Sequence, residues 1–345
     1  MKKNTKKLIS LFMLIIIAAA FVVGCTKNET NDNTGDNTEK NELTKVVVSE
    51  FRSTNYAPVH VAYLNGYFEE EGLNVEFAVY GDGPVAFQGM HAGDSQFCML
   101  SIDPVLKAFD QGLESTVVAA VDTIRLYGFV GSKDITDLSQ LKGKAIFAGA
   151  PGSAPYTFVW SILENAGLDP EKDVTFVQTQ YGASISALNQ GTIDASYMGN
   201  ANRNRFKEIG ANFLVDCADP ETRKEIFGSD RYEASIITTT KKYAQENPEI
   251  IQKFVNATVR GCEWIQNHSD EEVAELLAPM YDGTPMETLI EQIQLTRIAY
   301  SPDGFITEEG YAAMEGFCLK AGIIENPVGY ENIIDMSFVE KAKQN

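Results

Sequence analysis

The sequence predicts an α/β protein built from two lobes. Three observations support this fold class: the length of 345 residues, the 44% content of hydrophobic residues, and a strand-helix alternation that begins near residue 45 and again near residue 142. A chain of this length exceeds what one hydrophobic core normally fills. Strands separated by short helices indicate parallel β-α-β units, so we expect two lobes of such units.

The N-terminal segment has the pattern of an export signal. An apolar run of 16 residues, 8–23, follows a positively charged start made by Lys2, Lys3, Lys6 and Lys7, as in a secretory signal peptide. The closing Val22-Val23-Gly24-Cys25 resembles the lipobox of bacterial lipoproteins. This resemblance implies that residues 1–24 are removed and that Cys25 carries diacylglycerol. A transmembrane anchor is the alternative, because the run falls just short of a bilayer-spanning length.

Residues 25–44 are expected to form a disordered tether. From residue 26 the segment consists mainly of Asn, Thr, Asp, Glu and Lys, with one Leu and no aromatic residue. It cannot bury enough apolar area to offset the entropy lost on ordering. Such a tether would hold a folded body near the membrane and leave it free to turn.

The net charge excludes one class of partner. The whole chain has a net charge of −20; without residues 1–24, which carry four Lys and no acidic residue, 24 basic residues face 48 acidic ones, which gives −24. Such a surface repels nucleic acid and anionic lipid headgroups. We therefore expect no nucleic-acid partner.

The histidines and cysteines give little material for a metal centre, and we expect no cofactor. The chain has three histidines and no CxxC pair, so ligand spacings typical of metal sites are missing. Four cysteines besides Cys25 are expected to be buried free thiols, with disulfides as the alternative in an exported protein. They are Cys98, Cys217, Cys262 and Cys318.

The first run of the pattern extends from residue 45 to residue 131. Strands are expected where β-branched and apolar residues dominate, at residues 45–51, 72–79, 96–100, 115–121 and 126–131. Helices are expected at residues 58–65, 85–92 and 105–110. Gly66 and Gly93 end the first two helices, and Gly83-Pro84 begins the second, as glycine and proline commonly do.

The second run begins at Lys142. Its strands are expected at residues 145–148, 174–178, 193–198 and 213–215, and its helices at residues 157–166 and 183–190. A strand at residues 233–239 is expected to return to the first lobe. The remaining segments are amphipathic helices, which we expect to form an outer layer over the first lobe rather than a site; they are residues 244–267, 271–281, 286–296 and 308–321.

Polar turns after the strands indicate a ligand site. In an open α/β sheet, ligands bind at the carboxyl ends of the strands, where helix N-termini present free N–H groups and a partial positive charge. Each run places such a turn after an equivalent strand, at residues 101–103 in the first and 199–202 in the second. Two lobes with facing turns would enclose a cleft.

A string of motifs resembles a known family. In order, the segments are Tyr56-Ala57-Pro58, AYLNGYFEEEGLNV at residues 62–75, residues 137–153 and YAQENPEIIQK at residues 243–253. Together they resemble the nitrate, sulfonate, taurine and thiamine-precursor group of ABC-importer substrate-binding proteins. The resemblance covers residues 45–267.

The resemblance implies a type II periplasmic-binding-protein fold and a permease partner. Lobe one would comprise residues 45–137 and 236–345, and lobe two residues 138–235, with hinge crossovers near residues 133–137 and 230–235. Closure would bury a small solute and present a shape that an ABC permease in the cytoplasmic membrane recognises. The protein would be a monomer, anchored by lipid to the outer face of that membrane.

The resemblance places candidate ligand contacts of lobe one on the turns after its strands: Phe51, Arg52, Tyr56, Gly83, Pro84, Ser101 and Asp103. A solvated side chain is the alternative for Arg52, and an ordinary tight turn for Gly83-Pro84. A carboxylate at a helix start usually caps it, so capping is the alternative for Asp103. If Asp103 faced the ligand, it would repel nitrate or a sulfonate and favour an amino group.

The candidates of lobe two are Gly152, Ser153, Tyr156, Tyr181, Asn200, Asn202 and Arg203. Helix capping is the alternative for Asn200, and an exposed helix face for Arg203. Four aromatic residues on these turns, Phe51, Tyr56, Tyr156 and Tyr181, would suit a flat heterocycle by stacking.

Three functions stay open, and the leading one is a lipid-anchored receptor that delivers a small organic solute to an ABC importer. We favour a planar nitrogen heterocycle such as a pyrimidine or thiamine precursor over a sulfonate or taurine, with nitrate last. The second is an enzyme of pyrimidine synthesis, because relatives include one that consumes its own His, although its cysteine-rich cluster is absent here. The third is a solute sensor. We expect no catalytic residues.

Overall fold

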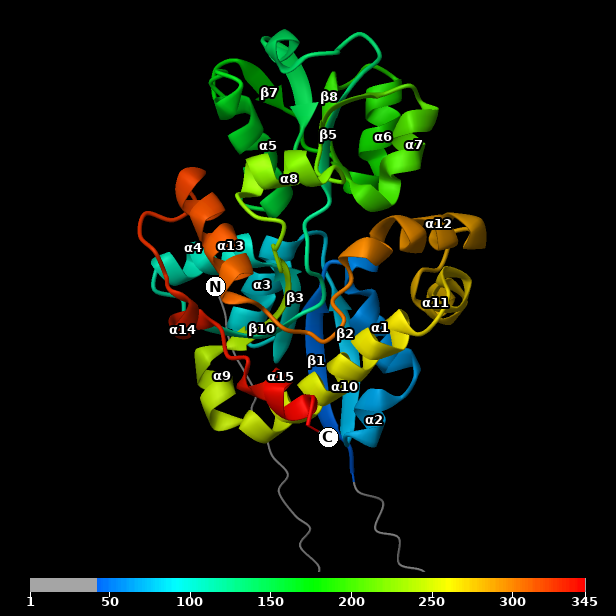
Figure 1. The fold of residues 1–345 in the computed structure, drawn as a ribbon, viewed down its shortest axis with the longest axis vertical. Coiled ribbons are helices and arrows are strands. Elements are labelled where there is room, and N and C mark those ends of the chain that lie inside the picture. Colours follow the sequence, from blue (N-terminus) through cyan, green and yellow to red (C-terminus); the bar gives the residue numbers. More distant parts are fainter. Residues whose placement is uncertain (1–41, 345) are drawn as a thin grey trace, which may run out of the picture. The chain divides into compact units, whose positions relative to one another are not determined.

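The computed structural model describes residues 42–344, which hold two five-stranded sheets and the helices that cover them (Figure 1). The predicted signal peptide, the lipidation site at Cys25 and most of the predicted tether lie outside these residues. Within them, no helix is both long enough and apolar enough to cross a membrane.

The first sheet has the strand order β2-β1-β3-β10-β4. Strands β1 and β2 pair in parallel, as do β1 and β3, whereas β10 is antiparallel to both of its neighbours. The strands are β1 (Thr44–Glu50), β2 (Leu73–Val79), β3 (Phe97–Ser101), β4 (Ser115–Ala120) and β10 (Ser235–Thr240). The predicted return of the chain to the first sheet is thus present as β10.

The second sheet has the order β7-β6-β8-β5-β9. Its strands are β5 (Tyr127–Gly131), β6 (Lys144–Phe147), β7 (Val174–Phe176), β8 (Ala195–Gly199) and β9 (Asn212–Asp216). The sequence analysis placed β5 in the first lobe, but β5 pairs antiparallel with β8 and β9. The first crossing between the sheets therefore precedes residue 127, not residues 133–137.

The helices fall into three groups along the chain. The first group follows strands of the first sheet, and the second group follows strands of the second sheet. The first group is α1 (Ala57–Leu64), α2 (Tyr67–Glu70), α3 (Gly83–Ala92) and α4 (Ile102–Asp110), and the second is α5 (Ala154–Asn165), α6 (Tyr181–Asn189), α7 (Arg203–Glu208) and α8 (Pro220–Phe227). The C-terminal group is α9 (Lys241–Glu246), α10 (Pro248–Gln266), α11 (Asp270–Leu277), α12 (Met286–Thr296), α13 (Glu308–Lys320), α14 (Tyr330–Ile333) and α15 (Ser337–Ala342). Short 3₁₀ turns include η1 (Thr54–Tyr56), η2 (Leu138–Leu141), η3 (Asn200–Asn202), η4 (Ala278–Met280) and η5 (Arg297–Ala299).

Helix α10 covers the first sheet through aromatic and small residues. The ring of Phe254 stacks on Phe97 of β3, with 4.2 Å between centroids. Gly261 lets α10 approach α1 closely, because a Cβ at this position would lie 2.1 Å from the carbonyl oxygen of Pro58.

The four described cysteines are free and buried, as predicted.

The chain crosses between the sheets twice, at residues 121–126 and at residues 217–234. Backbone hydrogen bonds join the first crossing to the second and to the start of β10. The amide of Val121 donates to the carbonyl of Ser235 at 2.8 Å, and the amide of Tyr232 donates to the carbonyl of Thr123 at 3.0 Å. Such a double crossing is the usual place for a hinge between two lobes.

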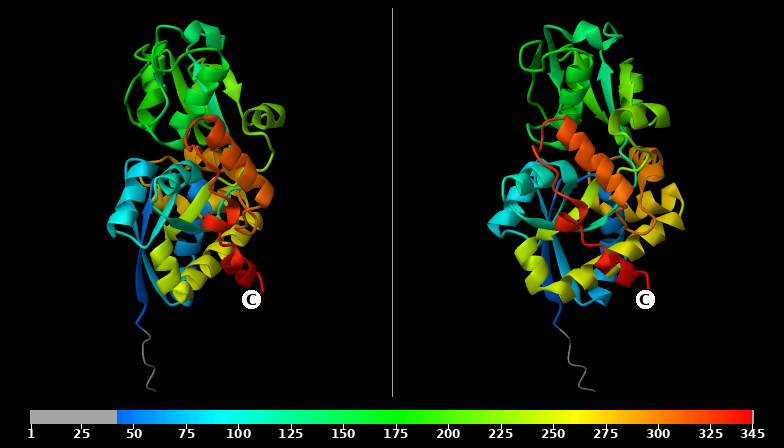
Figure 2. Two further views of the ribbon diagram at one scale, coloured as in Figure 1. Left: turned by 90° about the vertical axis from the view of Figure 1, so that its left-hand side faces the viewer. Right: turned by 60° about the vertical axis from the view of Figure 1, so that its left-hand side comes forward.

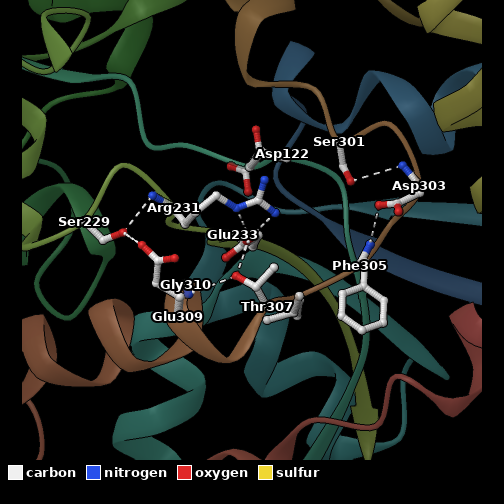
Figure 3. A network of polar contacts seen from close by, with 12 residues as sticks. Asp122, Ser229, Arg231, Glu233, Ser301, Asp303, Phe305, Thr307, Glu309 and Gly310 are labelled. Atoms are coloured by element: carbon white, nitrogen blue, oxygen red, sulfur yellow. Dashed lines mark hydrogen bonds and ion pairs between the residues drawn. The ribbon is translucent and has the colours of Figure 1, made fainter.

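A polar network ties the second crossing to α13 (Figure 3). Arg231 Nε donates to Glu233 at 2.7 Å, and the hydroxyl of Thr307 donates to the same carboxylate oxygen at 3.0 Å. Glu233 is fully buried, and its burial raises its pKa. Helix α13, drawn in orange, also lies near the second sheet's helices (Figure 2). Its Phe317 ring lies 5.1 Å from the ring of Phe227 on α8.

Candidate functional site

A cleft of about 770 Å³ lies between the carboxyl ends of the strands of the two sheets. On the first sheet it is lined by the turns after β1, β2 and β3, and on the second by the turns after β6, β7 and β8. Carboxyl ends of parallel strands are where open α/β sheets bind ligands. The expected meeting of turns from both halves is therefore present.

Helix starts from both sides contribute backbone N–H groups to this cleft. Asp82 caps α3 by accepting from the amide of Val85 at 3.0 Å, and Ser153 caps α5 by accepting from the amide of Tyr156 at 3.4 Å. Gln180 precedes α6 without a side-chain cap. Asp82, Ser153 and Gln180 all line the cleft, so the partial positive ends of three helices meet there.

The cleft wall is rich in aromatic side chains. The rings of Phe51, directly after β1, and Tyr181, at the start of α6, lie 5.3 Å apart, so the two sides are in contact at this point. The other tyrosines of the wall are Tyr56, Tyr80, Tyr127, Tyr197 and Tyr281. Burial raises the pKa of Tyr181 to about 12 and that of Tyr197 well above its usual value. These phenols are therefore neutral hydrogen-bonding groups near neutral pH.

The charges at the cleft nearly cancel. Among its described lining residues, Arg52 and Asp82 are the ionisable acidic or basic ones. Arg52 is not free, since its Nη2 lies 2.6 Å from the buried carboxylate of Glu50 and its Nη1 donates to the carbonyl of Met280 at 3.3 Å. Glu50 in turn contacts Nε2 of His60 at 2.7 Å.

Most of the predicted ligand contacts line this cleft. They are Phe51, Arg52, Tyr56, Gly83, Pro84, Ser101, Ser153, Tyr181, Asn200 and Asn202. Their contact with a ligand stays a prediction. Asn200 also donates its side-chain amide to the carbonyl of Leu295 on α12, so it connects the two sides.

Asp103 does not line the cleft, which corrects the prediction for this residue. Its carboxylate is 1% exposed and accepts two hydrogen bonds from Arg125, at 3.2 and 2.9 Å. The guanidinium of Arg125 lies between the rings of Tyr127 and Tyr232, 4.7 and 4.6 Å from their centroids. Asp103 therefore binds Arg125 of the first crossing segment instead of facing the cleft.

Three further candidates also lie outside the cleft lining. Tyr156 packs on Phe176 with 4.8 Å between ring centroids, because its helical position turns it toward β7. Arg203 forms an ion pair with Asp216 on β9. Gly152 has a φ of +83°, so it shapes the turn before Ser153 in a conformation that favours glycine.

The C-terminal helices contribute to the site, contrary to the expectation of an outer layer alone. Tyr281, Thr284 and Gln292 line the cleft. Tyr281 and Thr284 lie between η4 and α12, and Gln292 lies on α12. Their amphipathic sequence pattern gave no signal of this role. Tyr127 and Tyr197, on strands β5 and β8, were missed because strand aromatics usually indicate core packing.

A family model described as NMT1/THI5 like matches residues 53–272, which is more than half of the chain. The chain belongs to the NMT1/THI5-like family. This confirms the resemblance drawn from the sequence motifs.

Proteins similar to this chain have names that differ in ligand and activity. A Bacillus subtilis protein named as an aliphatic sulfonates-binding protein is 23% identical over 337 residues, covering 96% of this chain and 96% of that protein. The formylaminopyrimidine-binding protein of Halalkalibacterium halodurans is 26% identical over 282 residues, covering 79% and 78%. A 4-amino-5-hydroxymethyl-2-methylpyrimidine phosphate synthase of Candida albicans is 22% identical over 242 residues, covering 64% and 66%.

Solved structures confirm the fold. A protein of Bordetella bronchiseptica matches with a TM-score of 0.78 and 25% identity, over 88% of this chain and 98% of that chain. The periplasmic aliphatic sulphonate binding protein of Escherichia coli matches with a TM-score of 0.64 and 15% identity, over 84% and 97%. The NMT1/THI5-like chain therefore has the periplasmic-binding-protein fold that the sequence predicts. Fold alone does not decide function.

Proposed function

We propose that this protein is the solute-binding component of an ABC importer and captures a small organic solute by closing its two lobes. One observation carries the proposal: helix starts and aromatic rings from both sheets line a single cleft. A site divided between two lobes is completed only when they close, so ligand binding and closure are coupled. The relatives named as binding proteins support the same function.

Closure needs a hinge and a contact that is made when the lobes meet. The two crossing segments, residues 121–126 and 217–234, are the proposed hinge, with lobes divided accordingly. Asn200 and Asn204 of the second lobe donate to Leu295 and Glu291 of α12. These bonds join the second lobe to the first, so they favour the closed state.

The favoured ligand is a planar nitrogen heterocycle such as a pyrimidine or a thiamine precursor. Aromatic rings from both lobes can stack on a flat solute, and the rings of Phe51 and Tyr181 contact each other at the cleft at an interplanar angle of 53°. Tyrosine hydroxyls and the amides of Asn200, Asn202 and Gln292 offer both donors and acceptors. A small anion would use few of these groups.

A sulfonate or taurine is the second candidate ligand. The observation in its favour is the convergence of the starts of α3, α5 and α6 on the cleft, because helix N-termini bind anionic groups. The full-length similarity to a protein named for aliphatic sulfonates also supports it.

We propose that the protein binds without catalysis. His60 is fully buried and contacts Glu50 and Tyr281 at 2.7 and 3.0 Å, and it is not among the residues that line the cleft. The four described cysteines are separate and buried, so they offer no clustered reactive site. These placements favour a receptor over an enzyme of pyrimidine synthesis.

The proposed location is the outer face of the cytoplasmic membrane, with Cys25 as the lipidated residue and residues 25–44 as a tether. The support is the signal-like sequence before Gly24-Cys25. Two acyl chains suffice for stable anchoring. A monomer that delivers its solute to a membrane permease fits this arrangement.

A thermal-shift screen of the purified protein tests the proposal. The panel contains pyrimidines including a formylaminopyrimidine, flavins, alkyl sulfonates, taurine and nitrate. A ligand at 100 times its Kd adds about 2.7 kcal/mol to the free energy of unfolding, so a true ligand should raise the Tm by several degrees. A shift with sulfonates alone would replace the heterocycle by the second candidate. Turnover of any compound, followed by mass spectrometry, would contradict the receptor function.

A further inference from the structure

A buried carboxylate lies directly behind the one cationic side chain among the described residues of the cleft wall. Glu50, the last residue of β1, is fully buried, and its Oε1 lies 2.6 Å from Nη2 of Arg52. The Arg52 side chain is 25% exposed, and Arg52 lines the cleft. An opposite charge at this distance balances the charge of the guanidinium and reduces its attraction for a second anion, although Glu50 Oε1 accepts no hydrogen bond among the described residues.

The carboxylate is held in place from its other side. Glu50 Oε2 lies 2.7 Å from Nε2 of His60, and Nδ1 of His60 lies 3.0 Å from the hydroxyl of Tyr281. An ionised carboxylate can only accept, so Nε2 of His60 donates to it. In a neutral imidazole Nδ1 then accepts, and the Tyr281 hydroxyl donates to it.

Arg52 is restrained by two more contacts. Its Nη1 donates to the carbonyl of Met280 at 3.3 Å, and its guanidinium carbon lies 5.6 Å from the ring centroid of Phe77. The guanidinium therefore points at protein partners on several sides. The remaining charged side chain of the described cleft lining is the carboxylate of Asp82, which disfavours a ligand anion further.

We propose that Glu50 is a specificity-determining residue: by neutralising Arg52 from behind the cleft wall, it sets the site against anionic solutes and in favour of uncharged ones. This inference rests on the proposed function and names the charge class of its ligand. Glu50 acts through Arg52 without touching the solute. His60 and Tyr281 serve as positioning residues that keep the carboxylate buried and fixed.

The test compares three proteins with two probes by isothermal titration calorimetry. The proteins are the wild type, Glu50→Gln, and the double variant Glu50→Gln with Arg52→Gln; the probes are a formylaminopyrimidine and ethanesulfonate. Gln can still accept from His60 Nε2 through its amide oxygen, so the variant preserves that hydrogen bond. A thermal melt of each variant reports whether it is folded.

We expect ethanesulfonate to bind Glu50→Gln roughly 10-fold to 100-fold more tightly than the wild type, as one freed charge-assisted pair allows. The gain should weaken with added salt and vanish in the double variant. If Glu50→Gln folds but does not gain sulfonate affinity, or if the gain survives the loss of Arg52, the inference is wrong. Tight, Arg52-dependent binding of ethanesulfonate by the wild type would also overturn it.

Failure of the proposed function gives a different result. If neither these probes nor the wider screen of solutes binds the wild type, the receptor function itself fails. If the wild type binds a solute and only the charge preference is absent, the receptor function stands and the role of Glu50 does not. Rescue by Glu50→Asp, which restores a carboxylate, should return the sulfonate affinity toward the wild-type value.

Discussion

At the scale of single residues, the proposed binding of a flat solute depends on the aromatic side chains of the cleft wall. Tyr181 reaches across to Phe51, and both line the cleft. A flat solute between the lobes would stack on such rings. This role differs from that of Tyr156, a tyrosine on the same lobe that packs against Phe176 and Trp160 away from the cleft.

The first prediction compares these two tyrosines. Tyr181→Ala should weaken binding of the heterocycle by about 1 kcal/mol or more, which is roughly a fivefold or larger rise in Kd. Tyr156→Ala removes the same atoms elsewhere, so it should lower the Tm but leave the Kd within about twofold. Calorimetric titration measures both. Equal effects of the two substitutions on Kd would show that the cleft is not the binding site.

The second prediction concerns Asp122, in the first crossing segment. Burial raises its pKa to about 7, against the hydrogen bond that its carboxylate accepts from the amide of Ser235. A folded-state pKa above the unfolded value of about 3.9 means that the folded protein binds more protons between these pH values. The contribution of Asp122 to stability is therefore largest in acid and falls as the pH rises toward 7.

Urea unfolding of the wild type and Asp122→Asn at several pH values checks this sign. The variant lacks the titration, so its free energy of unfolding relative to the wild type should increase from pH 5 to pH 7, by at most about 1.4 kcal/mol for each pH unit. A difference that is constant across this range would contradict the raised pKa.

The sequence predicts which residues line the cleft where the position of a turn alone brings a residue there. Ser153 and Gly83 were placed at the cleft because helix starts after parallel strands point there. Asp103 occupies an equivalent turn, but its orientation depends on Arg125, which lies 22 residues away. A long-range ion pair of this kind has no local signal.

At the scale of elements, alternation of strands and helices predicts the parallel units well and the antiparallel strands poorly. Strands β1 to β3 and the helices between them follow a local pattern. Strand β5 was expected in the first lobe, because it precedes the second run of the pattern, yet β5 lies in the second sheet. The sequence of a short apolar strand does not indicate which sheet the strand joins, because its pairing partners depend on the whole fold.

The third prediction uses two helical glycines. At Gly261 of α10, a Cβ would lie 2.1 Å from the carbonyl oxygen of Pro58 on α1, whereas at Gly316 of α13 it would meet nothing within 4 Å. Gly261→Ala should destabilise the protein by about 1–3 kcal/mol through overpacking. Gly316→Ala should be neutral or stabilise by up to about 1 kcal/mol, because Ala favours helix.

Chemical denaturation of both glycine variants separates the two effects. The close approach of α10 to α1 is part of how the C-terminal helices cover the first sheet. If Gly261→Ala proved as stable as Gly316→Ala, the packing of α10 against α1 would have to be looser than described.

At the scale of the whole molecule, the proposed closure depends on contacts between the second lobe and α12. Asn204 donates to Glu291 of α12 across this boundary. The fourth prediction is that Asn204→Ala weakens solute affinity several-fold by raising the free energy of the closed state, since a lost hydrogen bond costs about 1 kcal/mol. Stopped-flow measurements should show the change mainly as faster dissociation. An unchanged dissociation rate would mean that this contact does not stabilise closure.

A crystal structure of the protein with a solute from the thermal-shift screen tests the central claim most directly. The account predicts one solute molecule between the lobes, stacked near Phe51 and Tyr181 and hydrogen-bonded by amides at the starts of α5 and α6. A solute bound outside this cleft, or one chemically altered in the crystal, would contradict it.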